Sequence, residues 1–188
     1  KQDALETVVD RKVPIVPTLT FQANLIDYGH TVGTAPFVQD LFRREIADSA
    51  EMLKKAYDQG VPILCGSESG FSVTPYGHWH FREMEVLMKE MGFTALEAIR
   101  SSTSENALAM RLEGEIGRVE EGSLADLILV CVDPLKDITV LGDLEKIQMV
   151  MKGGEIQKFE EEESRLPISG WRVISYGQIM TQDLVKPK

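Results

Sequence analysis

Apolar residues recur every three or four positions between residues 37 and 57, which is the pattern of a helix with one buried face. Pro36 suits the first turn of that helix, and Gly60 suits its end. A second amphipathic pattern predicts a helix over residues 81–91, and residues 1–11 have the composition of a helix end. These three segments are the clearest helix signals in the chain.

Two short apolar runs predict strands. Residues 61–65 are almost wholly apolar and too short for a helix, which is typical of a strand buried on both faces. Residues 13–21 are rich in β-branched side chains, although their two prolines cannot donate to a neighbouring strand. Residues 22–36 contain two glycines and little periodicity, so we expect a loop there. The strand–helix order over residues 13–91 predicts parallel βα units and an α/β fold.

Two short helices are expected next, over residues 94–101 and 104–110. Thr94 and Ser104 have the side chains of helix N-caps, and Glu97 stands at capping-box spacing from Thr94.

Beyond residue 113 glycines separate short apolar runs, which is typical of an all-β segment. The expected strands are residues 126–132, 146–152 and 155–159. We interpret the acidic run 160–163 as a solvated stretch, and residues 166–188 give no pattern that places them.

Composition narrows the classes of function. The chain has 188 residues, a formal net charge of −10 and a pI near 4.8, which disfavours binding to nucleic acid or to an anionic membrane surface. No apolar run approaches the length of a membrane span, and no signal peptide opens the chain, so we expect a cytoplasmic protein. Cys65 and Cys131 lie in apolar runs and are expected to be buried, reduced thiols.

The first candidate for chemistry is a carboxylate directly after the predicted buried strand. The strand ends in Gly66-Ser67-Glu68-Ser69-Gly70, where glycine lets the backbone turn sharply. In α/β barrels the C-terminal ends of the strands carry the catalytic residues. Glu68 therefore stands where a catalytic side chain is expected, and the alternative is a surface carboxylate on a turn.

Four further runs follow this turn in a characteristic order: Gly92–Arg100, Ser104–Met110, Gly117–Leu127 and Val150–Ile156. Together they resemble the C-terminal part of the metal-dependent amidohydrolase superfamily, in its imidazolonepropionase and prolidase-like branch, over roughly residues 10–160. The resemblance implies a partial (β/α) TIM barrel made of its last two βα units in residues 1–112. It also implies a small C-terminal β-sandwich segment in residues 113–188.

The resemblance also gives Glu68 a role. In this superfamily the matching position is an Asp that binds the catalytic metal and acts as the general base on the attacking water. Glu68 keeps the carboxylate but reaches about one methylene further, and active sites are sensitive to shifts of about 1 Å. It is therefore expected either to keep both roles, as catalytic base and ligand to zinc, or to mark a degenerate site.

Three histidines and a tyrosine complete the candidates. His78 and His80 form a His-x-His pair in the polar, aromatic loop before the second helix, with Tyr76 nearby, and His30 lies in the predicted loop after the first strand. The metal-binding His-x-His of the superfamily belongs to the first barrel strand, so this pair does not match it. We expect these four side chains to face the substrate. The alternatives are ordinary packing and a separate zinc site built from Glu68, His78 and His80.

Two neighbouring carboxylates receive structural roles. Glu83 is expected to stabilise the start of its helix, and Asp126 to support the turn before a strand.

The main hypothesis is the C-terminal portion of an amidohydrolase that hydrolyses an amide, a cyclic amide or a dipeptide with zinc-activated water. A full barrel takes about 250 residues, so this chain alone is expected to lack the zinc and the activity. It would form a homo-oligomer or pair with the missing barrel half, which would complete the site for a small-molecule substrate. The alternative hypothesis is a non-catalytic structural or interaction module with a degenerate site.

Overall fold

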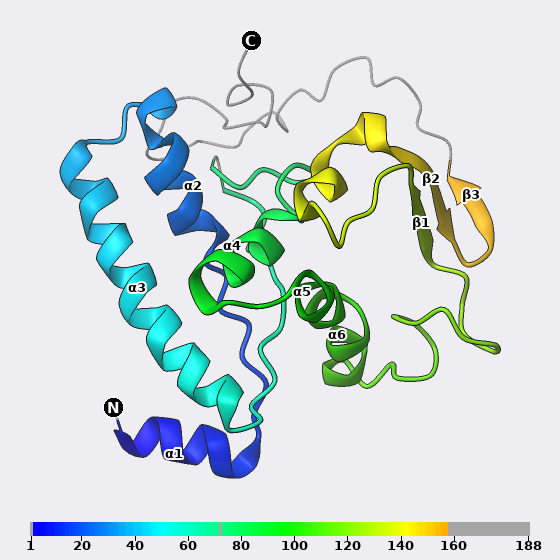
Figure 1. Ribbon diagram of the computed structural model, residues 1–188, viewed down its shortest axis with the longest axis horizontal. Coiled ribbons are helices and arrows are strands. Elements are labelled where there is room, and N and C mark those ends of the chain that lie inside the picture. The colour runs from blue at the N-terminus through cyan, green and yellow to red at the C-terminus, as the bar shows by residue number, and fades with distance from the viewer. Residues whose placement is uncertain (1, 72, 158–188) are drawn as a thin grey trace.

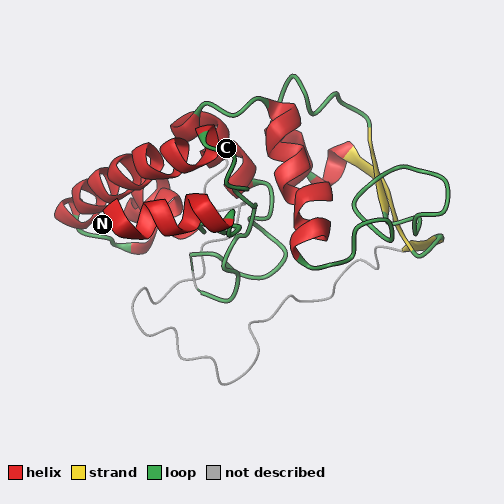
Figure 2. Cartoon of the chain, turned by 90° about the horizontal axis from the view of Figure 1, so that it is seen from below, coloured by secondary structure: helices red, strands yellow, loops and turns green. Residues whose placement is uncertain are grey.

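The computed structural model describes residues 2–71 and 73–157. Figure 1 shows the helices of residues 2–91 on one side, the small sheet on the other, and the two helices of residues 95–109 between them. The described chain is a mixed α/β structure that is mostly helical, with one three-stranded antiparallel sheet. Figure 2 shows the same arrangement from below, with the strands gathered at one end.

The helices expected from periodicity are present. They are α1 (Gln2–Arg11), α3 (Pro36–Asp58), α4 (Arg82–Met91), α5 (Ala95–Ser102) and α6 (Ser104–Ala109). Pro36 lies at the start of α3, and Gly92 ends α4 with a left-handed φ of 75°.

The expected cap of α5 is confirmed. Thr94 Oγ1 accepts from the Glu97 N–H at 3.2 Å, and the Thr94 N–H donates to Glu97 Oε2 at 2.8 Å, so both halves of the capping box are formed. The expected cap of α6 is wrong. Ser104 is the first residue of that helix, and the cap position belongs to Thr103, whose side chain makes no capping bond.

The loop expected over residues 22–36 is wrong. That stretch contains α2 (Thr20–Tyr28) and a 3₁₀ helix, η1 (Gly29–Val32). The two glycines lie at helix ends, where Gly29 caps α2 and Gly33 ends η1 with a φ of 78°. Leu25, fully buried, anchors α2 in a cluster with Val73 and Trp79. Tertiary packing therefore stabilises a helix whose own periodicity is weak.

The two strands expected in the N-terminal half are only extended segments. They meet in one parallel bridge, in which the Ile15 N–H donates to the Pro62 carbonyl at 3.0 Å and the Leu64 N–H donates to the Ile15 carbonyl at 2.8 Å. The prolines of the first segment interrupt the ladder, and its expected last residues, Thr20 and Phe21, belong to α2. The expected burial of the second segment is confirmed, because Ile63 is fully buried.

The second segment also contacts the helices that follow it. The Cys65 N–H donates to the Ser101 carbonyl at 3.2 Å, and Asn106 Nδ2 donates to the Cys65 carbonyl at 3.0 Å. The segment therefore lies between Ile15 on one edge and the ends of α5 and α6 on the other.

The C-terminal strands were expected correctly as far as the described residues reach. They are β1 (Leu127–Val130), β2 (Ile147–Lys152) and β3 (Glu155–Gln157), in the order β1-β2-β3, with two 3₁₀ helices, η2 (Ile138–Gly142) and η3 (Leu144–Lys146), between β1 and β2. Asp126 has the structural role expected of it, because its Oδ1 accepts from the Gly153 N–H at 2.6 Å in the β2–β3 turn. The acidic run 160–163 and residues 166–188 lie outside the described residues.

No helix in the described part of the chain is both long and apolar enough to cross a membrane. The two cysteines are free thiols. Both were expected to be buried, and this prediction is wrong for Cys131. Cys65 is largely covered, whereas Cys131 is exposed because it follows directly on the edge strand β1.

Candidate functional site

The two extended segments run in parallel, so their C-terminal ends meet at the same edge of the fold. Each ends in a residue other than glycine with a left-handed backbone, Thr18 with a φ of 54° and Glu68 with a φ of 47°. Such residues are uncommon and often mark sites where the fold holds a strained turn. This edge, which we call the strand-end site, is where the sequence placed its candidate carboxylate.

Glu68 is exposed at the strand-end site and its backbone is fixed by the loop that follows. Thr74 Oγ1 donates to the Glu68 carbonyl at 3.2 Å, and the Gly70 N–H donates to the Thr74 carbonyl at 2.9 Å. Thr74 is fully buried, so it anchors a turn whose carboxylate side chain remains free to meet solvent or a ligand.

The structure brings one predicted histidine beside this turn. His80 Nδ1 lies 3.4 Å from Ser67 Oγ, and Ser67 Oγ lies 2.8 Å from Ser69 Oγ. The two serines flank Glu68 in the chain, so His80 and Glu68 belong to one polar surface.

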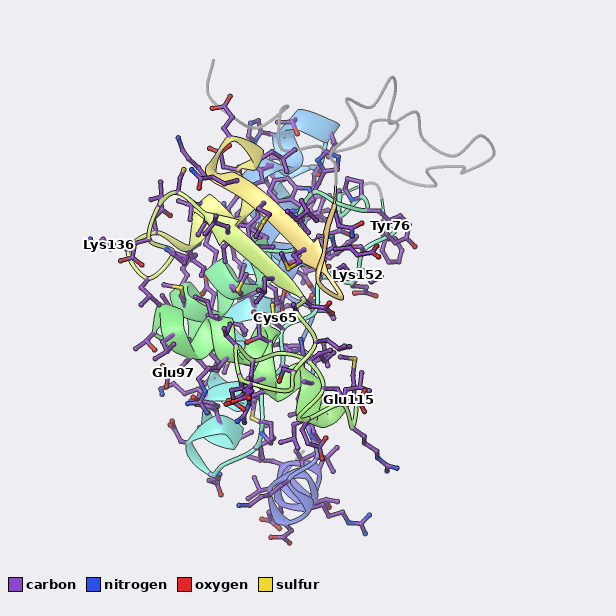
Figure 3. The ribbon with its side chains drawn as sticks, turned by 90° about the vertical axis from the view of Figure 1, so that its right-hand side faces the viewer. Cys65, Tyr76, Glu97, Glu115, Lys136 and Lys152 are labelled. Carbon is purple, nitrogen blue, oxygen red and sulfur yellow. The ribbon has the colours of Figure 1, made fainter. Side chains whose placement is uncertain are left out.

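The other candidates are more scattered. Tyr76 is exposed and projects from the edge of the molecule in Figure 3, while His78 is half-buried in the same loop. His30 is exposed in η1, and within the described chain no hydrogen bond joins it to Glu68 or to His80. The structure thus groups His80 with the Glu68 turn and leaves His30 apart.

The donor side chains of the described residues do not cluster. Within residues 2–71 and 73–157, no group of three or more His, Cys, Asp or Glu side chains could hold a metal ion. The alternative zinc site of Glu68, His78 and His80 is therefore not formed. The residues described here do not by themselves make a metal centre.

The sequence did not reveal the buried, hydrogen-bonded carboxylate near this edge, which belongs to Glu83. It lies in the first turn of α4, as expected, but its side chain is fully buried and reaches the end of the first extended segment. Glu83 Oε1 accepts from the Leu19 N–H at 2.9 Å, and Oε2 accepts from the Thr20 N–H at 2.8 Å and from Thr20 Oγ1 at 2.6 Å. Glu83 therefore fastens α4 to the turn at Thr18.

The electrostatics of this buried corner follow from desolvation. Burial raises the pKa of the Glu83 carboxyl above its ordinary range, although the donors at Thr20, Leu19 and Thr18 oppose that rise. Burial, and then the nearby charge of Glu83, raises the pKa of the Cys65 thiol to about 12. A raised pKa disfavours the thiolate, which is the nucleophilic form, so Cys65 has the character of a packing group.

The comparison with known sequences identifies the family to which this chain belongs. The pattern of the Amidohydrolase family matches residues 7–157, and the chain belongs to that family. Its resemblance to the prolidase-like branch is also confirmed.

Among curated proteins, the chain is similar to an ochratoxinase of Aspergillus niger, with 30% identity over 115 residues. That alignment covers 60% of this chain and 23% of the ochratoxinase, so the chain spans about a quarter of the length of this relative.

Among solved structures, a Xaa-Pro dipeptidase crystallised with methionine in its active site superposes with a TM-score of 0.64 and 28% identity, over 85% of this chain and 38% of that one. The A. niger ochratoxinase superposes with a TM-score of 0.65 and 23% identity, over 83% of this chain and 34% of that one, which shows a shared fold.

Proposed function

We propose that this chain is the C-terminal portion of a metal-dependent amidohydrolase that hydrolyses carbon–nitrogen bonds in amides, cyclic amides or dipeptides. The observation that carries the proposal is the exposed Glu68 carboxylate at the end of a parallel-paired segment, in a chain that matches the family over residues 7–157. The substrate would be a small molecule, in keeping with the dipeptidase among the structural relatives.

In this proposal the described fold is a portion of a (β/α) barrel. The segments joined at Ile15 and Ile63, with α3 and α4, would be the last two βα units within residues 1–112. Strands β1 to β3 would then belong to a small β-sandwich within residues 113–188.

The outer edge of the first segment supports a partner for this sheet. Among the described residues the backbone of Val16 has no hydrogen-bond partner, and the side chains of Val13 and Val16 are 45% and 48% exposed. A groove of about 620 Å³ follows in the chain, lined by Pro17, Leu19 and Gln22 and by residues of α3. An uncovered edge strand is a liability, so we propose that the rest of the barrel, or a second copy of the chain, covers this edge.

The family is metal-dependent, and we propose zinc as the metal of the complete protein. Glu68 would be the ligand that this chain contributes, and its carboxylate would accept the proton of the attacking water. His80, His78, Tyr76 and His30 would face the substrate. Because the residues described here do not form a metal centre, we assign no catalytic step to the chain alone.

A non-catalytic interaction module is the second candidate. It is favoured by one observation, which is that Glu68 replaces the aspartate of the superfamily and lengthens the side chain.

The experiment is metal analysis by mass spectrometry together with light scattering, on the chain alone and on its native assembly. We expect far less than one zinc per chain and no hydrolysis from the chain alone. Zinc and hydrolysis are expected with a polypeptide that carries the missing His-x-His, with Glu68→Gln abolishing hydrolysis and Glu68→Asp retaining it. Stoichiometric zinc in the chain alone, or full activity of Glu68→Gln in the assembly, would contradict the proposal.

A further inference from the structure

The carboxylate of the strand-end site stands on an exposed turn whose backbone is strained. Glu68 has a φ of 47°, in the left-handed region that residues with a side chain rarely adopt. Such a conformation persists only where the surrounding contacts enforce it. Because the backbone angles set the direction of the Cα–Cβ bond, those contacts also decide how the Glu68 carboxylate is presented.

The loop after Glu68 supplies the first of these contacts. Thr74 Oγ1 donates to the Glu68 carbonyl at 3.2 Å. The Gly70 N–H donates to the Thr74 carbonyl at 2.9 Å, and the Thr74 N–H donates to the Phe71 carbonyl at 3.1 Å. Thr74 is fully buried, whereas Glu68 is exposed, so the turn is held from its inner side.

A side chain of α2 holds the same loop one residue earlier. Asn24 Nδ2 donates to the Val73 carbonyl at 2.7 Å, across 49 positions of the chain. Asn24 and Val73 are both fully buried, so water does not replace this bond when it is lost. The start of α2 is itself fixed, because Thr20 donates to the buried carboxylate of Glu83.

Two hydrogen bonds therefore connect the helical core to the exposed turn, from Asn24 to Val73 and from Thr74 to Glu68. We propose that Asn24 and Thr74 are positioning residues for the Glu68 carboxylate, an inference that rests on the catalytic role proposed for Glu68. Neither residue is assigned a contact with substrate or metal. Their effect comes through the geometry of Glu68, and a misplacement of about 1 Å in an active site can cost about 100-fold in rate.

The first test measures the backbone of Glu68 in the full chain by NMR. A positive φ brings the N–H and Hα hydrogens of one residue close together, so Glu68 should show a strong intraresidue NOE between them. Thr74→Val keeps the shape of the buried side chain, removes its hydroxyl and should weaken this NOE, whereas Thr74→Ser should retain it. Both variants should fold, because the carbonyl left without a partner belongs to an exposed residue that water reaches. Asn24→Ala removes the other bond and should weaken the same NOE.

The second test measures hydrolysis by the native assembly, with kcat referred to the folded fraction of each variant. Thr74→Val and Asn24→Ala should lower kcat at least about tenfold and change KM by less than about twofold, because they alter the group that reacts and not the contacts that bind substrate. Thr74→Ser should restore kcat. A role in stability alone would leave kcat per folded molecule unchanged.

Tyr57→Phe is the matched control. It also removes one side-chain hydroxyl, which donates to Glu97 Oε1 at 3.0 Å, but it does so in the last turn of α3, before the second extended segment begins. It should leave the Glu68 NOE and kcat unchanged.

A wild-type NOE or a wild-type kcat in Thr74→Val or in Asn24→Ala would overturn the inference, as would equal losses in Thr74→Ser and Thr74→Val. Failure of the proposed function is a separate result, because it would appear as full hydrolysis by Glu68→Gln whatever the NOE shows.

Discussion

Glu83 accepts two hydrogen bonds from Thr20, a residue 63 positions earlier, at 2.8 Å from its backbone N–H and at 2.6 Å from its hydroxyl. Both residues are fully buried. This pair joins α4 to the end of the first extended segment and so determines where Thr18 and, across the parallel bridge, the Glu68 turn lie relative to the helices.

Replacing Glu83 with alanine should destabilise the chain strongly. Three donors at Leu19 and Thr20 would lose their acceptor in a site that water does not reach, with an expected cost of about 3–5 kcal/mol. Urea unfolding measures the loss. Glu113→Ala, at an exposed position, is the control and should change stability by less than about 0.5 kcal/mol. A Glu83→Ala variant as stable as this control would show that the buried contacts contribute nothing.

Adding one methyl group at Gly66 should disturb the strand ends. A Cβ at that position would lie 2.5 Å from Val16 Cγ1, so Gly66→Ala forces the two segments apart. Overpacking of this kind costs about 1–3 kcal/mol. The double variant Val16→Ala with Gly66→Ala removes the obstructing methyl and should recover most of that loss in urea unfolding. If the double variant loses as much free energy of unfolding as the two single variants lose together, the close approach of Val16 is not the cause.

The stability that Tyr57 contributes should depend on alkaline pH. Burial and a 3.0 Å hydrogen bond to Glu97 raise the pKa of Tyr57 to about 12, above the ordinary tyrosine value of about 10. Because the folded pKa is the higher one, the contribution is fully present below pH about 10 and is lost as the pH rises toward 12. The stability difference between the wild type and Tyr57→Phe should therefore shrink over that window. A difference that grows or stays constant would contradict the raised pKa.

The two cysteines should differ in reactivity. Cys65 has a thiol whose pKa is raised to about 12 by burial, whereas Cys131 is exposed. Since the thiolate is the reactive form, iodoacetamide at mildly alkaline pH should label Cys131 and spare Cys65. Peptide mass spectrometry reads the labelling, and unfolding in urea should make both thiols react. Equal labelling in the folded chain would show that Cys65 is not protected.

Local patterns in the sequence determined much of this protein. The apolar stripe of α3, the capping box of Thr94 and Glu97, and the tight turn between β2 and β3 depend on neighbours within a few positions. Because the interacting residues are close in the sequence, periodicity and cap residues are enough to predict these features. The order of the runs from Gly66 to Ile156 also identified the family and put Glu68 after a buried apolar segment.

Only the tertiary structure decided the contacts between distant segments. Helix α2 forms because Leu25 packs against Val73 and Trp79, and the first extended segment keeps one bridge because its prolines interrupt the ladder. The sequence placed Glu83 at a helix start, but its hydrogen-bond partners lie more than sixty positions away. No pattern within α4 predicts which residues they are. The same is true of His80 beside Ser67, and of Arg82 between Asp27 and Glu85. Which side chains meet across such distances is determined by the packing of whole elements, and that packing has no signature in any single stretch of sequence.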